Sequence, residues 1–237
     1  MKTERTLVWD LPTRAFHWLL ALSFAGAWLT AESERWRDIH VLLGYTVAAL
    51  IVFRLLWGVF GTRYARFASF TLDPRAVFDY LKSLATRTPR HYFGHNPAGS
   101  WAIVAMLALL ALTAATGWAA YAELGPEWLE DLHEGAANAT LALVLVHVAA
   151  VFASSLLHRE NLVGAMVTGY KPGAGDAAAG TRWFVALVLV GAVGAFWAGL
   201  IPAPGLERGT ALTSLVAKGA PALSARGDRR GGDDDDD

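Results

Sequence analysis

Five long apolar stretches, nearly free of charged residues, are the dominant pattern along the chain. They cover residues 15–31, 39–62, 96–122, 135–157 and 183–206, and only the second contains a charged residue, Arg54. A run of about 17 to 25 apolar residues can cross the hydrocarbon core of a bilayer as a helix. In lipid the backbone must satisfy its own hydrogen bonds, so each stretch is predicted to be helical. The pattern therefore predicts an all-α integral membrane protein.

Basic residues are distributed unevenly between the segments that connect these stretches. The segments before the first stretch, between the second and third, and between the fourth and fifth hold twelve Lys or Arg, against two in the remaining loops. Basic loops stay on the cytoplasmic side of a membrane. The N-terminus is therefore predicted to be cytoplasmic, and five crossings place the C-terminus on the opposite side. The loops on that side are acidic and include Glu123, Glu127, Glu130, Asp131 and Glu134.

The composition limits the classes of protein and the kinds of cofactor site that the chain can form. Charged residues make up 17% of the chain, below the roughly 25% of soluble domains, so the apolar surplus is expected to contact membrane lipid. The absence of Cys excludes iron–sulfur ligation, thiolate metal sites and covalently attached haem within this chain. A net charge of −1 argues against a nucleic-acid partner.

Four of the seven histidines fall at matched depths in the predicted helices. His133 and His147 are 14 residues apart, which is two heptads, so both face the same neighbours at a separation of roughly 21 Å. His40 lies level with His133, and His17 lies level with His147. Each layer thus offers one imidazole from each of two helices. Paired imidazoles are what the two axial positions of haem iron need.

Arg54 falls 14 residues after His40, on the same face and at the depth of the inner layer. A buried guanidinium suits a haem propionate, because its planar fork matches a carboxylate. The alternatives are that Arg54 extends to the cytoplasmic surface or bonds to a backbone carbonyl.

The other three histidines are not expected to be metal ligands. His91 and His95 are expected in the cytoplasmic loop, solvated or hydrogen-bonded to loop backbone. His158 lies at the inner end of the fourth stretch, where it is expected to be interfacial, although contact with a quinone head group is a second possibility.

At these residues the chain resembles the bacterial cytochrome b561 family, which is similar to the cytochrome b subunits of nickel–iron hydrogenases. The resemblance covers about residues 7–171. It rests on WDLPTRAFHW at 9–18, IHVLLGY at 39–45, FRL at 53–55, GHNP at 94–97, LHE at 132–134, VH at 146–147 and HREN at 158–161.

The resemblance implies a four-helix bundle with two haem b groups, held by His17 with His147 and by His40 with His133. It further implies a multi-pass protein of the bacterial inner membrane that passes electrons to or from quinone. A periplasmic or membrane redox protein is expected at the other end of the pathway. The expected organisation is a di-haem domain over residues 1–171, a linker and fifth transmembrane helix over 172–206, and a disordered periplasmic tail over 207–237.

Other functions fit parts of the pattern. A stand-alone quinone oxidoreductase acting on superoxide or a ferric chelate would need an open coordination position or an exposed haem edge. A proton or metal transporter would use the histidines without haem, and a structural anchor for a redox partner would leave the paired layers unexplained. The residues do not identify the electron donor, the electron acceptor or the direction of flow.

Overall fold

The structure is a computed structural model of the chain, and it describes residues 4–86, 88, 90–173, 175–178, 180–207 and 209–219. Most of this part of the chain is helical, and its strands are limited to one short antiparallel pair. Three of its helical segments are long and apolar enough to cross a membrane, namely Glu34–Phe60, Pro97–Tyr121 and Trp128–His158. The expectation of a mostly helical membrane protein is therefore confirmed, with three helices that are long and apolar enough to span a bilayer.

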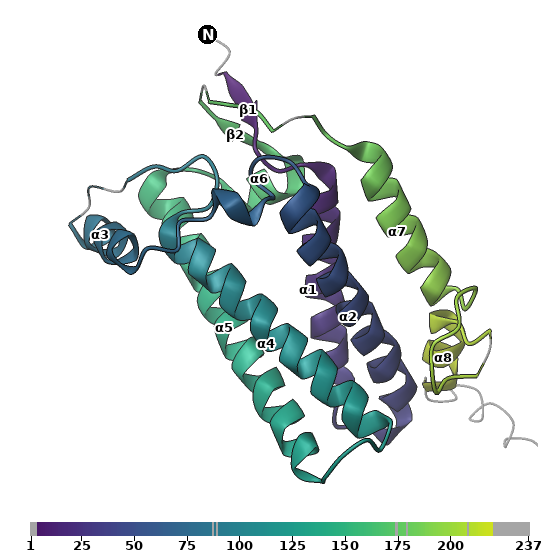
Figure 1. Cartoon of the computed structure of the whole chain (residues 1–237). Helices are drawn as coiled ribbons and strands as arrows, with labels where there is room; N and C mark the ends of the chain where they lie inside the picture. Colours follow the sequence, from purple (N-terminus) through teal and green to yellow (C-terminus); the bar gives the residue numbers. More distant parts are fainter. Residues whose placement is uncertain are drawn as a thin grey trace, which may run out of the picture.

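Four long helices form two antiparallel hairpins (Figure 1). In the first, α1 (Leu11–Thr30) and α2 (Arg37–Phe60) are joined through the 3-10 turn η1 (Glu34–Trp36). In the second, α4 (Pro97–Tyr121) is followed by α5 (Trp128–His158). The hairpins meet mainly where α2 packs on α4, around a core of Phe24, Val47, Ile51 and Leu110. The end of the bundle with both hairpin turns is called the hairpin end below.

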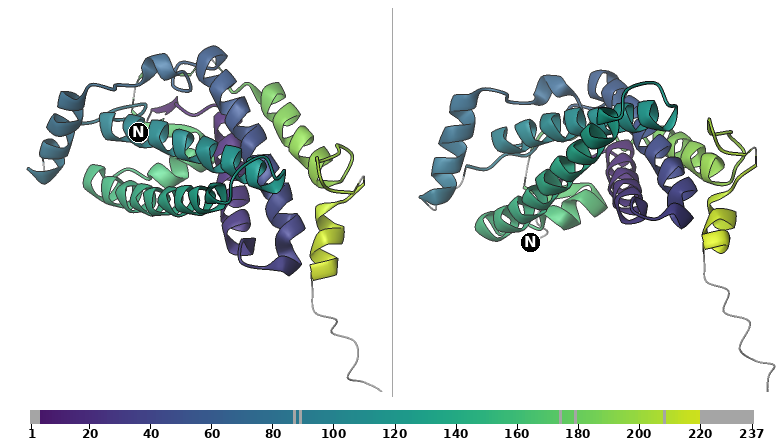
Figure 2. Two further views of the ribbon diagram at one scale, coloured as in Figure 1. Left: turned by 60° about the horizontal axis from the view of Figure 1, so that its bottom comes forward. Right: turned by 90° about the horizontal axis from the view of Figure 1, so that it is seen from below.

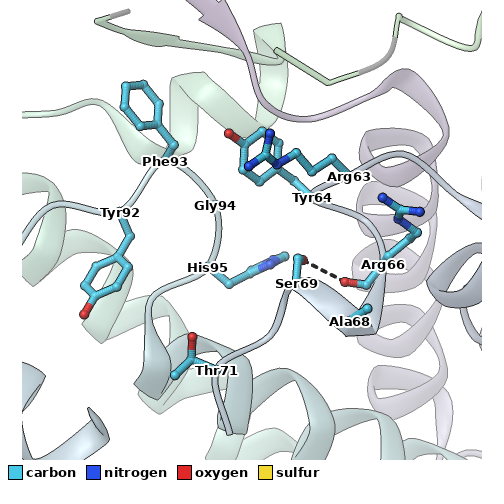
Figure 3. Close-up of a pocket in the computed structure, with 10 residues that line it drawn as sticks. All are labelled: Arg63, Tyr64, Arg66, Ala68, Ser69, Thr71, Tyr92, Phe93, Gly94 and His95. Atoms are coloured by element: carbon cyan, nitrogen blue, oxygen red, sulfur yellow. Dashed lines mark hydrogen bonds between the residues drawn. The ribbon is translucent and has the colours of Figure 1, made fainter. Parts of the chain in front are cut away.

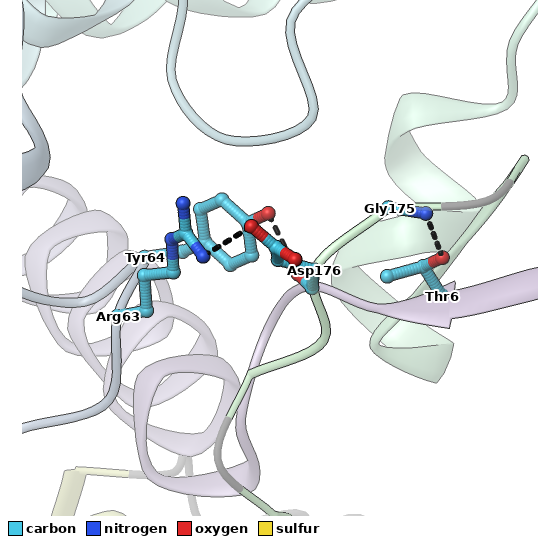
Figure 4. Close-up of polar contacts among 5 residues, drawn as sticks. All are labelled: Thr6, Arg63, Tyr64, Gly175 and Asp176. Atoms are coloured by element: carbon cyan, nitrogen blue, oxygen red, sulfur yellow. Dashed lines mark hydrogen bonds and ion pairs between the residues drawn. The ribbon is translucent and has the colours of Figure 1, made fainter.

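The opposite end is closed by segments that the apolar pattern does not predict. Strand β1 (Arg5–Leu7) pairs with β2 (Tyr170–Pro172), and α6 (Leu162–Thr168) leads into β2. Figure 4 shows how the neighbouring loops are fastened: Arg63 Nη1 lies 2.5 Å from Asp176 Oδ2, and the Tyr64 hydroxyl donates to the Asp176 carbonyl. The Gly175 amide also donates to Thr6 Oγ1 over 3.1 Å. This is called the sheet end.

The long basic connection between α2 and α4 contains further structure at the sheet end. It includes the 3-10 turn η2 (Phe67–Ser69) and helix α3 (Pro74–Ala85). Asp73 caps α3 by accepting a hydrogen bond from the Arg75 amide. The views in Figure 2 show α3 projecting to one side of the two hairpins.

The C-terminal part differs from its prediction. Helix α7 (Trp183–Trp197) has 15 residues, whereas the apolar pattern predicts helix as far as residue 206. It ends because Gly199 takes a positive φ of 74°, and Pro202 and Pro204, which lack an amide hydrogen, follow. Residues 212–219 were expected to be disordered, but they form helix α8 (Leu212–Gly219). Leu215 of α8 packs against Ile39 and Leu42 at the hairpin end. The rest of the expected tail, 220–237, lies outside the described residues.

Candidate cofactor site

His40 and His133 face each other near the hairpin end. Their ring centroids are 6.0 Å apart, and the ring planes are nearly perpendicular at 85°. Imidazole nitrogens bind metals at about 2 Å, so two rings that share one metal would have centroids about 6 Å apart. The structure thus brings together the first pair of predicted ligands at a spacing that metal ligation requires.

Hydrogen bonds fix the orientation of both rings. His40 Nδ1 lies 2.8 Å from the Ala27 carbonyl on α1, and His133 Nδ1 lies 2.8 Å from the Thr113 carbonyl on α4. A carbonyl oxygen can only accept, so each Nδ1 carries the proton and each Nε2 keeps its lone pair. Bonding of the distal ring nitrogen to a backbone carbonyl is the usual arrangement for a metal-ligating histidine.

The sequence around each carbonyl explains why the rings can reach it. Helix α1 ends at Thr30, so the Ala27 carbonyl is among the last four of the helix and lacks an intrahelical amide donor. Besides His40, it accepts from the Thr30 hydroxyl over 3.1 Å. On α4, a glycine provides the necessary space: a Cβ atom at Gly117 would lie only 2.6 Å from His133 Cε1. The absent side chain of Gly117 therefore lets the His133 ring approach α4.

The second predicted pair, His17 on α1 and His147 on α5, lies toward the sheet end. Charges on these two rings would interact across the bundle. The His17 Nδ1 atom is buried and has no hydrogen-bond partner among the described residues. Within the same part of the chain, no side-chain hydrogen bond orients either ring, so this pair is less constrained than His40 and His133.

Arg54 does not extend to the membrane surface. Its side chain is only 3% exposed, and its Cζ atom lies 4.7 Å from the centroid of the Phe67 ring. Nη1 is buried without a partner among the described residues. The charge of Asp10 acts on Arg54 from nearby, but among the described residues no carboxylate bonds to the guanidinium. Its buried Nη1 atom is therefore suited to bond to an added anion.

His95 differs from its prediction as a solvated or backbone-bonded loop residue. Its ring is packed between Trp9 and Phe70, at centroid distances of 4.6 and 4.8 Å. Its Nδ1 atom is buried and lacks a partner in the described part of the chain. Burial, followed by the charges of Arg54, Lys171 and His147, lowers the pKa of His95 to about 3, so the ring is neutral at physiological pH.

Helix α4 begins directly after His95. The Asn96 side chain caps the helix by accepting from the Gly99 amide over 2.7 Å. His91 and His158 lie at the exposed edge instead, where their Nδ1 atoms are 3.3 Å apart. That location agrees with the loop and interfacial positions expected for them.

The histidine pairs fit haem better than a bare ion. Among the described residues, no three His, Asp or Glu side chains gather into a metal site. A metal held by two imidazoles needs further ligands, and the four nitrogens of a porphyrin supply them. These features define the chain as a mostly helical membrane protein in which His40 and His133 are spaced as two ligands of one metal would be.

Comparisons with known proteins agree with this class. The sequence model of prokaryotic cytochrome b561 matches residues 8–169, so the chain belongs to that family. It is a bacterial membrane cytochrome of b type that functions in electron transfer. No solved structure gives a significant match.

The chain is also similar to proteins described as probable Ni/Fe-hydrogenase B-type cytochrome subunits. The protein from Azotobacter vinelandii is 27% identical, over 72% of this chain and 90% of its own length. The protein from Azotobacter chroococcum mcd 1 is 26% identical with the same coverage. The protein from Rhizobium leguminosarum bv. viciae is 22% identical, again over 72% and 90% of the two chains.

Proposed function

We propose that the chain holds two b-type haems and conducts electrons across the bacterial inner membrane. One haem is assigned to His40 and His133, and the other to His17 and His147. The observation that carries the proposal is the pair of Nδ1 hydrogen bonds to backbone carbonyls, which leaves both Nε2 atoms of the first pair free to bind iron.

In this function the chain's residues position and insulate the redox groups. Haem supplies reversible one-electron chemistry at iron. The four histidines fix the depth of each group along the bundle, and the surrounding apolar side chains keep water away from it. Arg54 is assigned to a propionate of the haem nearer the sheet end, because its charge is buried and its Nη1 atom is unpartnered.

The electron donors and acceptors belong to other molecules. We assign quinone as the diffusible partner in respiratory electron transport, as the family resemblance suggests. The second partner is a periplasmic or membrane redox enzyme, since the relatives bear the names of hydrogenase subunits. A basic surface on that enzyme would complement the acidic residues of the hairpin end, which include Glu123, Glu127 and Glu130.

The experiment that tests the proposal is a reduced-minus-oxidised visible spectrum of the detergent-purified protein, with a pyridine haemochrome count. Two b-type haems per chain are expected. One haem per chain would contradict the assignment of two sites. A colourless protein would overturn the function and favour a haem-free transporter.

A further inference from the structure

Four buried side-chain nitrogens lie toward the sheet end without partners among the described residues: Nε of Arg14, Nδ1 of His17, Nη1 of Arg54 and Nδ1 of His95. Arg14 already donates to the Val167 carbonyl through its guanidinium, and His17 is assigned to haem iron. The remaining two come from different hairpins, because Arg54 is on α2 and His95 directly precedes α4. Buried polar groups in folded proteins are nearly always hydrogen-bonded. Two such donors in one region therefore indicate a ligand with acceptor atoms.

The two side chains share one environment. The His95 ring lies 4.8 Å from the Phe70 ring, and Arg54 Cζ lies 6.0 Å from the same ring. The charge of Arg54 acts directly on His95, as does that of His147. The donors are thus near each other and near a histidine assigned to haem.

The protein's own charged groups in this region are already engaged. Asp10, which is 1% exposed, accepts hydrogen bonds from the Thr13 amide, Trp57 Nε1 and Thr62 Oγ1. Lys171 Nζ donates to the Tyr92 carbonyl over 3.2 Å. Among the described residues, no carboxylate bonds to Arg54 or to His95 Nδ1.

We propose that His95 and Arg54 form a paired donor site for a propionate of the haem nearer the sheet end, with His95 as a positioning residue. This inference rests on the proposed function. Arg54 supplies the positive charge that a carboxylate requires, and the neutral His95 ring supplies a directed hydrogen bond.

A cavity adjoins this site. Its volume is about 470 Å³, and its lining includes His95, Arg63 and Arg66. Figure 3 shows the His95 ring pointing across the cavity toward Ser69 of η2. A propionate carboxylate bound at His95 could therefore reach water and the two arginines, Arg63 and Arg66, through this cavity. A quinone carbonyl is another oxygen acceptor that could use His95, but it does not need the charge of Arg54.

The test is a potentiometric titration of both haems in the purified holoprotein. His95→Leu removes the donor, His95→Asn keeps an N–H group near the position of Nδ1, and His91→Leu is the matched control on the exposed part of the same loop. Loss of a donor leaves the propionate more negative and stabilises ferric iron. At a fixed potential, His95→Leu should lower the reduced-to-oxidised ratio of one haem by about threefold to tenfold, the effect of one hydrogen bond.

The other haem should keep its potential, and His95→Asn should restore most of the shift. Arg54→Met should shift the same haem in the same direction, with Arg54→Lys as the conservative variant. Reconstitution with haem dimethyl ester, which lacks free carboxylates, shows whether His95 changes the haem potential through the propionate or in some other way. With this probe, the wild type and His95→Leu should have equal potentials.

Several results would overturn the inference while the proposed function stands. One is a wild type with two haems whose potentials do not respond to His95→Leu or Arg54→Met. Another is an unchanged pair of potentials together with a raised KM for quinol, which would assign His95 to quinone. Failure of the wild type to hold haem would instead refute the proposed function itself.

Discussion

At the scale of single residues, none of the four assigned histidines is redundant under the proposed pairing, because each would supply one side of one iron site. His40→Ala and His133→Ala should each reduce haem content from two to about one per chain, with the remaining signal from the sheet-end haem. His17→Ala and His147→Ala should remove the sheet-end haem and spare the other. Pyridine haemochrome counts with low-temperature spectra measure both effects.

His91→Ala is the control for these variants, since His91 lies at the exposed edge of the sheet end and should retain both haems. If all four ligand variants keep two haems per chain, the pairing is wrong. If a single variant of the His40 and His133 pair removes both haems, the two sites are not independent.

His95 should make the stability of the haem-free protein depend on pH. Its folded-state pKa is about 3, below the ordinary value of 6.5, so the unfolded chain binds the proton more tightly. The stability that the neutral ring contributes is present above pH 6.5 and is lost as the pH falls toward 3. The slope approaches about 1.4 kcal/mol per pH unit within this window.

Thermal unfolding of the apoprotein in detergent at pH 7 and pH 5 measures this loss. His95→Asn removes the titrating group and keeps a polar side chain of the same region, so its melting temperature should fall less between the two pH values. Equal falls for the wild type and the variant would show that His95 does not titrate in this window.

At the residue scale, a spacing rule was enough to predict which two rings lie together, while their ligation of haem stays a prediction. His40 and His133 were paired by their depth along helices, and the structure places their rings 6.0 Å apart. His95 was misjudged because its burial depends on Trp9 and Phe70, which come from different parts of the chain. No local pattern encodes that contact.

At the scale of elements, the close packing of α4 and α5 depends on Gly117. A Cβ atom there would lie 2.6 Å from His133 Cε1 and 2.8 Å from Nδ1, well inside van der Waals contact. Gly117→Ala should therefore displace the His133 ring, break its bond to the Thr113 carbonyl and weaken the hairpin-end haem. The expected result is a haem content that falls toward one per chain.

Gly191→Ala on α7 is a matched control, because a Cβ atom there has no neighbour within 4 Å, and the variant should keep both haems. Visible spectra and pyridine haemochrome counts of the two variants, prepared in the same detergent, compare their haem content per chain. Full occupancy and an unchanged spectrum in Gly117→Ala would show that His133 does not need its present position.

Hydrophobic runs predicted the existence of long helices better than their ends. Helix α5 begins at Trp128, seven residues before its charge-free run, because Glu130 and Asp131 lie in its first turn, where acidic side chains favour the helix dipole. Helix α3 and the strands β1 and β2 were missed. Helix α3 is short and amphipathic and so contains no long apolar run. The two strands have three residues each and pair across more than 160 residues.

At the scale of the whole molecule, the last apolar stretch connects the two ends of the bundle although its helix is short. The Leu11 amide donates to the Thr181 carbonyl at the sheet end, and the Tyr121 hydroxyl donates to the Gly205 carbonyl near the α4–α5 turn. Between these points, Trp197 Nε1 donates to Thr46 Oγ1 of α2 over 3.0 Å. The chain therefore runs the length of the bundle, which supports a fifth crossing.

The uneven distribution of basic residues then predicts which end faces the cytoplasm. The basic connections lie at the sheet end, so we expect that end inside and the hairpin end, with α8, in the periplasm. The chain has no Cys, so single cysteines can report on each location. Lys82→Cys on α3 should react with a membrane-impermeant maleimide only after spheroplasts are permeabilised. Glu130→Cys on α5 and Ser214→Cys on α8 should react in intact spheroplasts.

All three positions are exposed, so each cysteine should react once the membrane is permeable. Full labelling after permeabilisation is therefore the control for reactivity at each site. Labelling of Lys82→Cys alone in intact spheroplasts would reverse the orientation and place the acidic hairpin end in the cytoplasm. Labelling of Glu130→Cys without Ser214→Cys would separate α8 from the hairpin end and refute the fifth crossing. The expected pattern leaves the His40 and His133 site nearer the periplasm, where electrons from a periplasmic redox enzyme would enter.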